Sequence, residues 1–390
     1  MSSTTPSRRS GASSRLRASR RPPRLRTSWL GIRLIAHLQT WRLYTLWYVG
    51  FVGLAGAGLS PGPHEGLRLF AAWAVPTLGW LGGHYLSDYF DRDLDAIAKP
   101  HRPIPSGRLP ARTALACGVL AMLAVAVLAV LTGWRTSLIA VLAVAAVLAY
   151  GLKLKALGIA GNLVRGALGA LALLYGAACA PPFAWAVLLP FVAAFWLHDT
   201  CSNLVGTLRD VDGDRAGGYR TLPVTHGTAT GARVALGLYL LTLLAAGWGG
   251  LAAPASRHGW FLLGLAAVAA VGFAALLPLL GRRQSQAQLA AREALRAHEL
   301  LVLERMCLAA AVIGLGLGML PAVLLLIPAL TLTWWSQRAL RSWYEFGGTD
   351  QTSAPASVQA PVPVPPPADP PLDHPAGTAP PSLEKGSSYA

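Results

Sequence analysis

Runs of apolar residues long enough to cross a bilayer recur through most of this chain, and they restrict its fold more than any other feature. With 54% hydrophobic and 13% charged residues, the chain is not an ordinary soluble domain. The runs are rich in Leu, Ala, Val and Gly and lack strand-like alternation, so they predict an all-α, polytopic transmembrane helix bundle. We expect ten spans, near residues 43–60, 67–91, 110–132, 136–152, 158–180, 184–207, 231–252, 259–281, 300–319 and 321–337.

The domain boundaries follow from where these runs begin and end. The last two runs are split only by Leu320-Pro321, so nine spans with a broken final helix remain an alternative. We expect a transmembrane domain over residues 41–340, a disordered basic arm over 1–40 and a disordered Pro-rich tail over 341–390. An organelle transit peptide would resemble the arm in composition, but a juxtamembrane basic arm is the preferred interpretation.

The net charge of +16 is distributed by loop, which argues against nucleic-acid binding. Basic residues gather in alternate loops, within residues 99–112, 153–155, 209–233 and 282–296, whereas the opposite loops hold only Arg68, Arg135 and Arg257. This is the positive-inside bias of membrane proteins. It predicts an integral protein of the bacterial plasma membrane whose acidic clusters face the cytoplasm, in contact with membrane lipids.

Acidic residues are scarce, and eight of the seventeen lie in or near two short clusters at the ends of apolar runs. In the first, Asp88, Asp91 and Asp95 are spaced to share one helix face, and Asp93 points the other way. The second comprises Asp210, Asp212 and Asp214, in which Asp210 and Asp214 share a face with Asn203, and Asp199 lies upstream. Carboxylates at a bilayer surface that share faces in this way predict oxygen ligands for Mg²⁺, which would bridge a diphosphate. A solvated helix cap would explain one such residue but not both sets.

Basic loops follow each acidic cluster and supply candidate diphosphate contacts. The first loop, from Lys99 to Arg108, contains three prolines that limit its freedom. The second loop, from Asp214 to Pro223, has the same combination of Gly, Pro and basic residues. The candidates for stabilising the charge of a leaving diphosphate are Lys99, Arg102, Lys155, Arg209 and Arg220.

These patterns resemble the UbiA-type intramembrane prenyltransferase superfamily. Its first motif reads here Ser87-Asp88-x-x-Asp91-x-x-x-Asp95, followed by Lys99-Pro-His-Arg102-Pro-Ile. Its second motif reads Asp210-Val-Asp-Gly-Asp214, with Thr221-Leu-Pro downstream. A third match includes Tyr150, Lys155 and Asn162, and Arg42 stands where the family usually has Arg-Pro. The likeness covers roughly residues 40–320 and is closest to the branch of geranylgeranylglyceryl-phosphate geranylgeranyltransferases and chlorophyll synthases. Ser87 departs from the family's Asn, which puts that metal or diphosphate contact in doubt.

The resemblance implies a helix bundle around a central cavity and a Mg²⁺-dependent transfer of a prenyl group from an isoprenoid diphosphate to a hydrophobic acceptor, aromatic or lipid. It implies that Asp88, Asp91, Asp95, Asp210 and Asp214 are catalytic and hold the metal. Substrate contacts would come from Arg42, Ser87, Lys99, Arg102, Tyr150, Lys155, Asn162, Asn203, Arg209 and Arg220. Three alternatives remain open. They are a terpene cyclase on the same scaffold, a cation transporter, whose carboxylates would be expected at the midplane, and a binding protein that has lost catalysis.

Overall fold

The computed structural model of the protein describes residues 29–281 and 287–346, and nearly all of these residues lie in helices or short connections. The described part contains no strand, only one isolated bridge between Leu157 and Arg220. The predicted all-α bundle is confirmed.

Each of the ten apolar runs corresponds to one helix. The helices are α2 (Leu43–Leu59), α3 (Gly66–Phe90), α5 (Ala111–Thr132), α6 (Trp134–Leu152), α7 (Gly158–Cys179), α8 (Trp185–Arg209), α11 (Thr228–Ala252), α12 (His258–Leu276), α13 (Ala287–Gly316) and α14 (Met319–Ser336). Seven described helices are long and apolar enough to cross a membrane, namely α5, α6, α7, α8, α11, α12 and α14, the last two together with the turns that follow them. Helix α2 is apolar but has 17 residues. The number of spans therefore stays a prediction of nine or ten.

Both ends of the predicted transmembrane domain differ from the sequence-based boundaries. Helix α1 (Trp29–Trp41) lies within the segment expected to be disordered, because its apolar residues give it a packing face, and Ala36 is buried in a cluster with Tyr85 and Leu109. At the other end, the π-helix η4 (Gln337–Arg341) and α15 (Ser342–Phe346) extend the ordered chain beyond residue 340. The rest of the predicted arm and tail lies outside the described residues.

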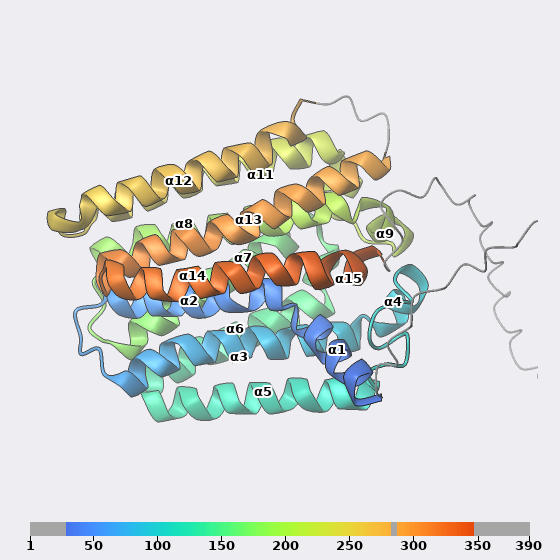
Figure 1. Cartoon of the computed structure of the whole chain (residues 1–390), viewed down its shortest axis with the longest axis horizontal. Coiled ribbons are helices and arrows are strands. Elements are labelled where there is room, and N and C mark those ends of the chain that lie inside the picture. The colour runs from blue at the N-terminus through green and yellow to red at the C-terminus, as the bar shows by residue number, and fades with distance from the viewer. Residues whose placement is uncertain (1–28, 282–286, 347–390) are drawn as a thin grey trace, which may run out of the picture. The chain divides into compact units, whose positions relative to one another are not determined.

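Short helices gather at one end of the bundle. They are α4 (Arg92–Ala98), η1 (Leu154–Ala156), α9 (Val211–Ala216) and α10 (Leu222–His226), and Figure 1 shows α4, α9 and α15 at the same end of the bundle. Two further single turns, η2 (Ala255–Arg257) and η3 (Leu277–Leu279), flank α12. Because α3 and α8 carry the acidic clusters at their C-terminal ends, the fold brings both clusters to the end where α4 and α9 lie.

Small residues allow the central helices to pack closely. Helix α2 lies against α7, where a Cβ atom on Gly176 would stand 1.7 Å from the carbonyl oxygen of Gly53. A Cβ atom on Gly56 would clash in the same way, 1.9 Å from the carbonyl oxygen of Leu173. Close backbone contact through glycine is typical of helices that associate within lipid. This contact fixes α2, and hence the residues at its N-terminal end, against α7.

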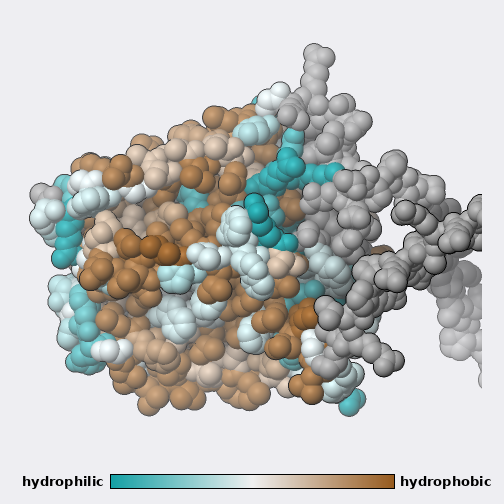
Figure 2. All heavy atoms as spheres, in the orientation of Figure 1, coloured by the Kyte–Doolittle hydropathy of each residue, from teal (hydrophilic) through white to brown (hydrophobic). Residues whose placement is uncertain are grey.

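The outer surface is apolar where lipid would contact it. Leu123, Val130 and Leu131 of α5 and Val141 of α6 are exposed, and few residues of these two helices are buried. Figure 2 shows apolar residues over most of the visible middle of the bundle and hydrophilic residues nearer its ends. An exposed apolar belt of this kind is expected of helices that face acyl chains rather than water.

Candidate active site

The two acidic clusters open onto one cavity of about 560 Å³. This volume lies within the usual range of small-molecule sites. Its walls come from α2, α3, α5, α6, α7, α8 and α13, and its middle part is lined by apolar residues such as Val125, Ile139, Val144 and Leu148. The polar end, where α4, α9 and α15 lie, could therefore hold a charged head while the apolar part holds a hydrocarbon chain.

The first acidic cluster divides between the cavity wall and the protein interior. Asp91 and Asp95 line the cavity. Asp91 Oδ2 accepts hydrogen bonds from Lys155 Nζ at 2.6 Å and Ser87 Oγ at 3.2 Å. Both oxygens of Asp95 accept from Arg102 Nη1, at 2.9 and 2.8 Å. Asp93 has an 86% exposed side chain, in agreement with the expectation that it points away.

Asp88 is buried behind this wall and is held by a residue at a helix break. Arg42 separates α1 from α2 with left-handed backbone angles, φ 47° and ψ 58°, which non-glycine residues seldom adopt. The break directs Arg42 Nη2 to within 2.6 Å of Asp88 Oδ1. The sequence match at Arg42 therefore corresponds to a direct ion pair with the first acidic cluster.

The second acidic cluster carries two carboxylates with opposite pKa shifts. Burial alone would raise the pKa of Asp210, but Arg209, at 2.6 Å, and Lys99, at 3.4 Å, lower it to about 2. Burial and then the charge of Asp210 raise the pKa of Asp214 to about 6, and Thr221 Oγ1 donates a hydrogen bond to it at 3.2 Å. The exposed Asp212 pairs with Arg215 at 3.3 Å. Among the described residues, Asp214 therefore forms no salt bridge, unlike the other carboxylates that line the cavity.

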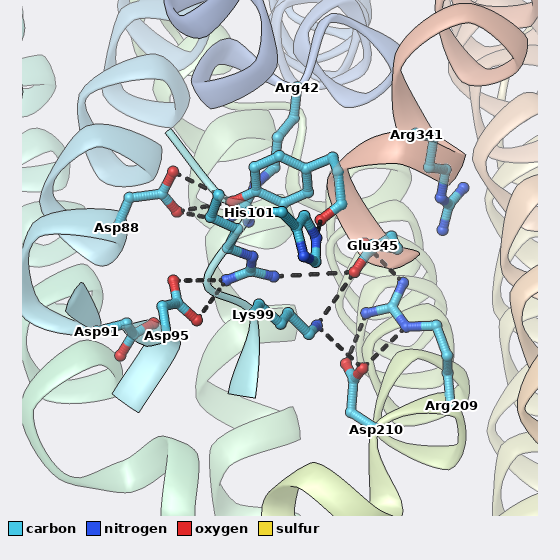
Figure 3. Close-up of polar contacts among 12 residues, drawn as sticks. Arg42, Asp88, Asp91, Asp95, Lys99, His101, Arg209, Asp210, Arg341 and Glu345 are labelled. Atoms are coloured by element: carbon cyan, nitrogen blue, oxygen red, sulfur yellow. Dashed lines mark hydrogen bonds and ion pairs between the residues drawn. The ribbon is translucent and has the colours of Figure 1, made fainter. Parts of the chain in front are cut away.

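A third set of site residues comes from α15, which sequence reasoning assigned to the disordered tail. Glu345 lies 2.9 Å from Arg209 Nη1, 3.2 Å from Lys99 Nζ and 3.8 Å from Arg102 Nη2. Although burial opposes the shift, these three cations hold the pKa of the Glu345 carboxyl well below its usual range. Figure 3 shows Glu345 facing Lys99 and Arg209 across the polar end of the cavity. No motif marks this residue, so the sequence offered no signal for it.

Tyr344, beside Glu345, completes the contact with the first cluster. Its hydroxyl donates to Asp88 at 2.9 Å and accepts from Arg42 Nη2 at 2.7 Å. The guanidinium groups of Arg42 and Arg102 lie 5.0 and 4.5 Å from the centre of its ring. The loop after the first cluster also reaches this segment, because His101 Nε2 donates to the Tyr344 carbonyl at 3.0 Å.

Some of the remaining residues predicted to contact substrate line the cavity, and others do not. Ser87, Tyr150 and Asn203 line the cavity, and Asn162 Nδ2 donates to Asn203 Oδ1 at 2.8 Å, joining α7 to α8 without lining the cavity itself. Arg220 is exposed and does not line the cavity; its backbone pairs with Ala156 and Gly158 instead. The structure therefore gives Arg220 a role in joining two loops rather than a side chain at the site.

A second polar region lies deeper in the same cavity, about two to three helical turns below the acidic clusters along α3 and α8. The Arg165 guanidinium stacks over Trp80 at 3.8 Å from the ring centre and forms no ion pair with any residue in the described part of the chain. Arg305 lies 3.5 Å from Asp199, whose two carboxylate oxygens are buried without a hydrogen bond. We call Trp80, Arg165, Asp199 and Arg305 the inner polar group. A charge such as that of Arg165 is costly at this depth without an ion pair, and it marks a functional region.

The donor set of the polar end suits a hard cation. In the described part of the chain, the ion pairs of Asp88, Asp91, Asp95, Asp210 and Glu345 involve Arg and Lys and no His, and oxygen-only ligands favour Mg²⁺ over zinc-like metals. In residues 29–281 and 287–346, however, no three acidic, His or Cys side chains lie close enough together to hold a metal ion. Salt bridges to basic residues occupy the carboxylates of Asp88, Asp91, Asp95 and Asp210. The carboxylate oxygens of these residues are the ligand type that Mg²⁺ prefers. For the metal to bind, each carboxylate would have to break its salt bridge with the basic residue.

Comparisons with known proteins find relatives of a single family. The model described as the UbiA prenyltransferase family matches residues 46–298, more than half of the chain. A digeranylgeranylglyceryl phosphate synthase of Thermococcus gammatolerans is 33% identical over 215 residues, which is 55% of this chain and 77% of that protein. One of the same name from Natronomonas pharaonis is 35% identical over 194 residues, covering 50% of this chain and 69% of the relative.

Solved structures show the same fold at lower identity. A UbiA homologue from Aeropyrum pernix aligns with a TM-score of 0.56 and 19% identity, over 69% of this chain and 96% of its own. A UbiA homologue from Archaeoglobus fulgidus bound to GPP and Mg²⁺ aligns with a TM-score of 0.52 and 13% identity, over 70% and 99%. The helix arrangement around the cavity is therefore shared with proteins whose sequences are very different.

Proposed function

The chain belongs to the UbiA prenyltransferase family, and on that premise we propose that it transfers a prenyl group from an isoprenoid diphosphate to a lipid acceptor. The observation that carries the proposal is the division of one cavity into a polar end and an apolar middle. Lys99, Arg102 and Arg209 converge at the polar end, and aliphatic side chains line the middle. A diphosphate joined to a hydrocarbon chain has the same division.

The residues of the polar end would act on the leaving group. When the C–O bond between the prenyl carbon and the diphosphate breaks, negative charge grows on the diphosphate oxygens. Lys99, Arg102 and Arg209 would stabilise that charge, and their positions in a largely buried site make each contact stronger than in water. Mg²⁺ held by Asp88, Asp91 and Asp95, and by Asp210 and Asp214, would neutralise further diphosphate charge. The electron-rich face of Tyr150, in the cavity wall, would face the allylic cation.

The inner polar group favours an acceptor over cyclisation. A cyclase needs only an apolar pocket beyond the diphosphate, whereas a separate acceptor brings a polar head that must be bound. Arg165 and Arg305 would bind an anionic head, and Asp199 is the candidate to accept the proton of the attacking hydroxyl. This choice is supported by relatives named digeranylgeranylglyceryl phosphate synthases, a name that describes a phosphate-bearing lipid product.

The orientation of the protein follows from the same proposal. The polar end lies beside the basic loops, so the positive-inside bias would put it on the cytoplasmic side of a bacterial plasma membrane. Water-soluble diphosphates would then reach the site from the cytoplasm, and the acceptor would enter from the bilayer.

The test is a product analysis with purified protein, Mg²⁺ and labelled geranylgeranyl diphosphate. With a membrane lipid extract we expect a prenylated lipid, and without it almost no product. Arg165→Gln should lower the rate with acceptor while leaving the affinity for inorganic pyrophosphate unchanged. A cyclic hydrocarbon formed rapidly without extract would refute acceptor transfer but not diphosphate cleavage. Absence of pyrophosphate release under every condition would refute both.

A further inference from the structure

The segment formed by Tyr344 and Glu345 enters the polar end of the cavity from outside the region matched by the family model, which ends at residue 298. Its side chains contact the cations to which we assign the diphosphate. Glu345 accepts hydrogen bonds from Arg209 Nη1 at 2.9 Å and Lys99 Nζ at 3.2 Å. Figure 3 shows its carboxylate between these two side chains. A carboxylate is thus positioned where an anionic leaving group would need to be.

The contacts make this segment a mimic of the substrate's charged head. A diphosphate and a carboxylate are both anionic oxygen groups that Lys and Arg bind with short, charge-assisted hydrogen bonds. Lys99, Arg102 and Arg209 cannot give the same N–H groups to both at once. Because Glu345 has only a 7% exposed side chain, the competition takes place in a largely dry environment, where each contact is strong.

Tyr344 extends the same competition to the first acidic cluster. Its hydroxyl holds Asp88, and its ring lies beneath the guanidinium groups of Arg42 and Arg102. While Tyr344 remains in place, Asp88 is covered and cannot turn toward the cavity. Trp343 packs against the loop from Lys99 to Arg108, edge to face with His101 at 5.6 Å and under Arg108 at 4.2 Å.

We propose that residues 343–345 form a self-inhibitory plug whose Glu345 carboxylate occupies the diphosphate site until a diphosphate displaces it. The segment would then leave as substrate enters, releasing three cations to the diphosphate and Asp88 to the cavity. A doubly or triply charged diphosphate gains more from these cations than one carboxylate does, whereas a monophosphate competes less well. The plug would therefore keep small cellular anions out of an electropositive site. The inference rests on the diphosphate site of the proposed function.

The first test measures binding, not turnover. Inorganic pyrophosphate and inorganic phosphate are titrated, in the presence of Mg²⁺, into the full-length protein and into Glu345→Gln. If the plug leaves only about one site in ten open, removing its charge should tighten pyrophosphate binding about tenfold. Phosphate binding should tighten by the same factor, because both anions compete with the same plug. Asp93→Asn removes one carboxylate from the same end of the bundle, at an 86% exposed position, and should leave both affinities unchanged.

The second test asks whether the segment moves. Hydrogen–deuterium exchange of backbone amides in residues 337–346 is measured with and without pyrophosphate. Displacement predicts faster exchange when pyrophosphate is bound, with no such increase in α7. Weaker pyrophosphate binding in Glu345→Gln, or unchanged or slower exchange in residues 337–346, would overturn the plug and make α15 a fixed part of the site. If no variant bound pyrophosphate, the proposed function would fall together with this inference.

Discussion

Replacing Asp91 with Asn tests whether a shared carboxylate face, rather than charge in general, carries the reaction. The substitution preserves the shape of the side chain and removes its charge. In the structure, Asp91 Oδ2 accepts hydrogen bonds from Lys155 Nζ at 2.6 Å and from Ser87 Oγ at 3.2 Å. The side chains of Asp91 and Lys155 are 15% and 21% exposed. A charge-assisted hydrogen bond contributes about 1.5–3 kcal/mol, and partial exposure favours the lower end, so the free energy of unfolding should fall by roughly 1–2 kcal/mol.

The expected loss of activity is larger than this loss of stability. Removing one group that stabilises charge in a transition state typically lowers the rate by about 10²–10³-fold. A stability loss of roughly 1–2 kcal/mol leaves a protein with ordinary stability almost entirely folded, so unfolding cannot produce that decrease in rate. The assay is initial pyrophosphate release from geranylgeranyl diphosphate with saturating acceptor, beside a thermal melt of each variant in the same detergent.

Asp93→Asn is the matched control, since Asp93 lies two residues away in the same cluster and its one ion pair within the described residues is with Arg92, at 3.6 Å. We expect its rate and melting temperature to match those of the unmodified protein. Equal losses of rate in the Asp91 and Asp93 variants would refute the idea that one helix face carries the reaction. They would show that the number of negative charges, not their position, governs the rate.

Three further perturbations address the metal, the orientation and the helix packing. Excess EDTA should abolish pyrophosphate release, and Mg²⁺ or Mn²⁺ should restore it; full activity in EDTA would contradict a carboxylate-held metal. In intact cells, a cysteine that replaces Ser106 should resist an impermeant thiol reagent, whereas one that replaces the exposed Glu65 should react. Labelling of the parent protein gives the background from its native cysteines. The reverse pattern would place the site outside the cell. Gly176→Ala should destabilise the bundle by about 1–3 kcal/mol or more in a thermal melt, because its Cβ would overlap the carbonyl of Gly53. The control is Gly237→Ala, whose Cβ would meet open space and which should be neutral or slightly stabilising.

The fold could be predicted from the sequence because its helices obey one strong local rule. A stretch of α5 such as Leu123 to Leu131 must face lipid or other apolar groups, and this can be recognised from its run of consecutive apolar residues. The ends of the bundle follow a weaker rule. Helix α1 forms within an arm whose composition suggests disorder, since a few apolar residues find a partner in Tyr85 that no local pattern reveals.

The candidate site was predictable only where its residues lie in motifs. Asp91 and Lys155 are separated by 64 positions, yet each belongs to a recognisable stretch, and the structure joins them. Glu345 contacts Lys99 across 246 positions and belongs to no motif, so only the folded chain reveals it. Arg220 shows the opposite case: it was predicted from its place in a basic loop, but its backbone makes the contacts. Sequence spacing reports which residues share a helix face and cannot report which distant helix covers that face.

The pairing of charges at the polar end has a consequence for how the protein reaches the membrane. Five cations face five carboxylates there, and their formal charges cancel: Arg42, Lys99, Arg102, Lys155 and Arg209 against Asp88, Asp91, Asp95, Asp210 and Glu345. A charge left alone near the hydrocarbon would oppose insertion, and a buried charge without a partner would destabilise the bundle. Pairing these ten charges within the protein lowers the cost of bringing them to the edge of the bilayer as the bundle forms.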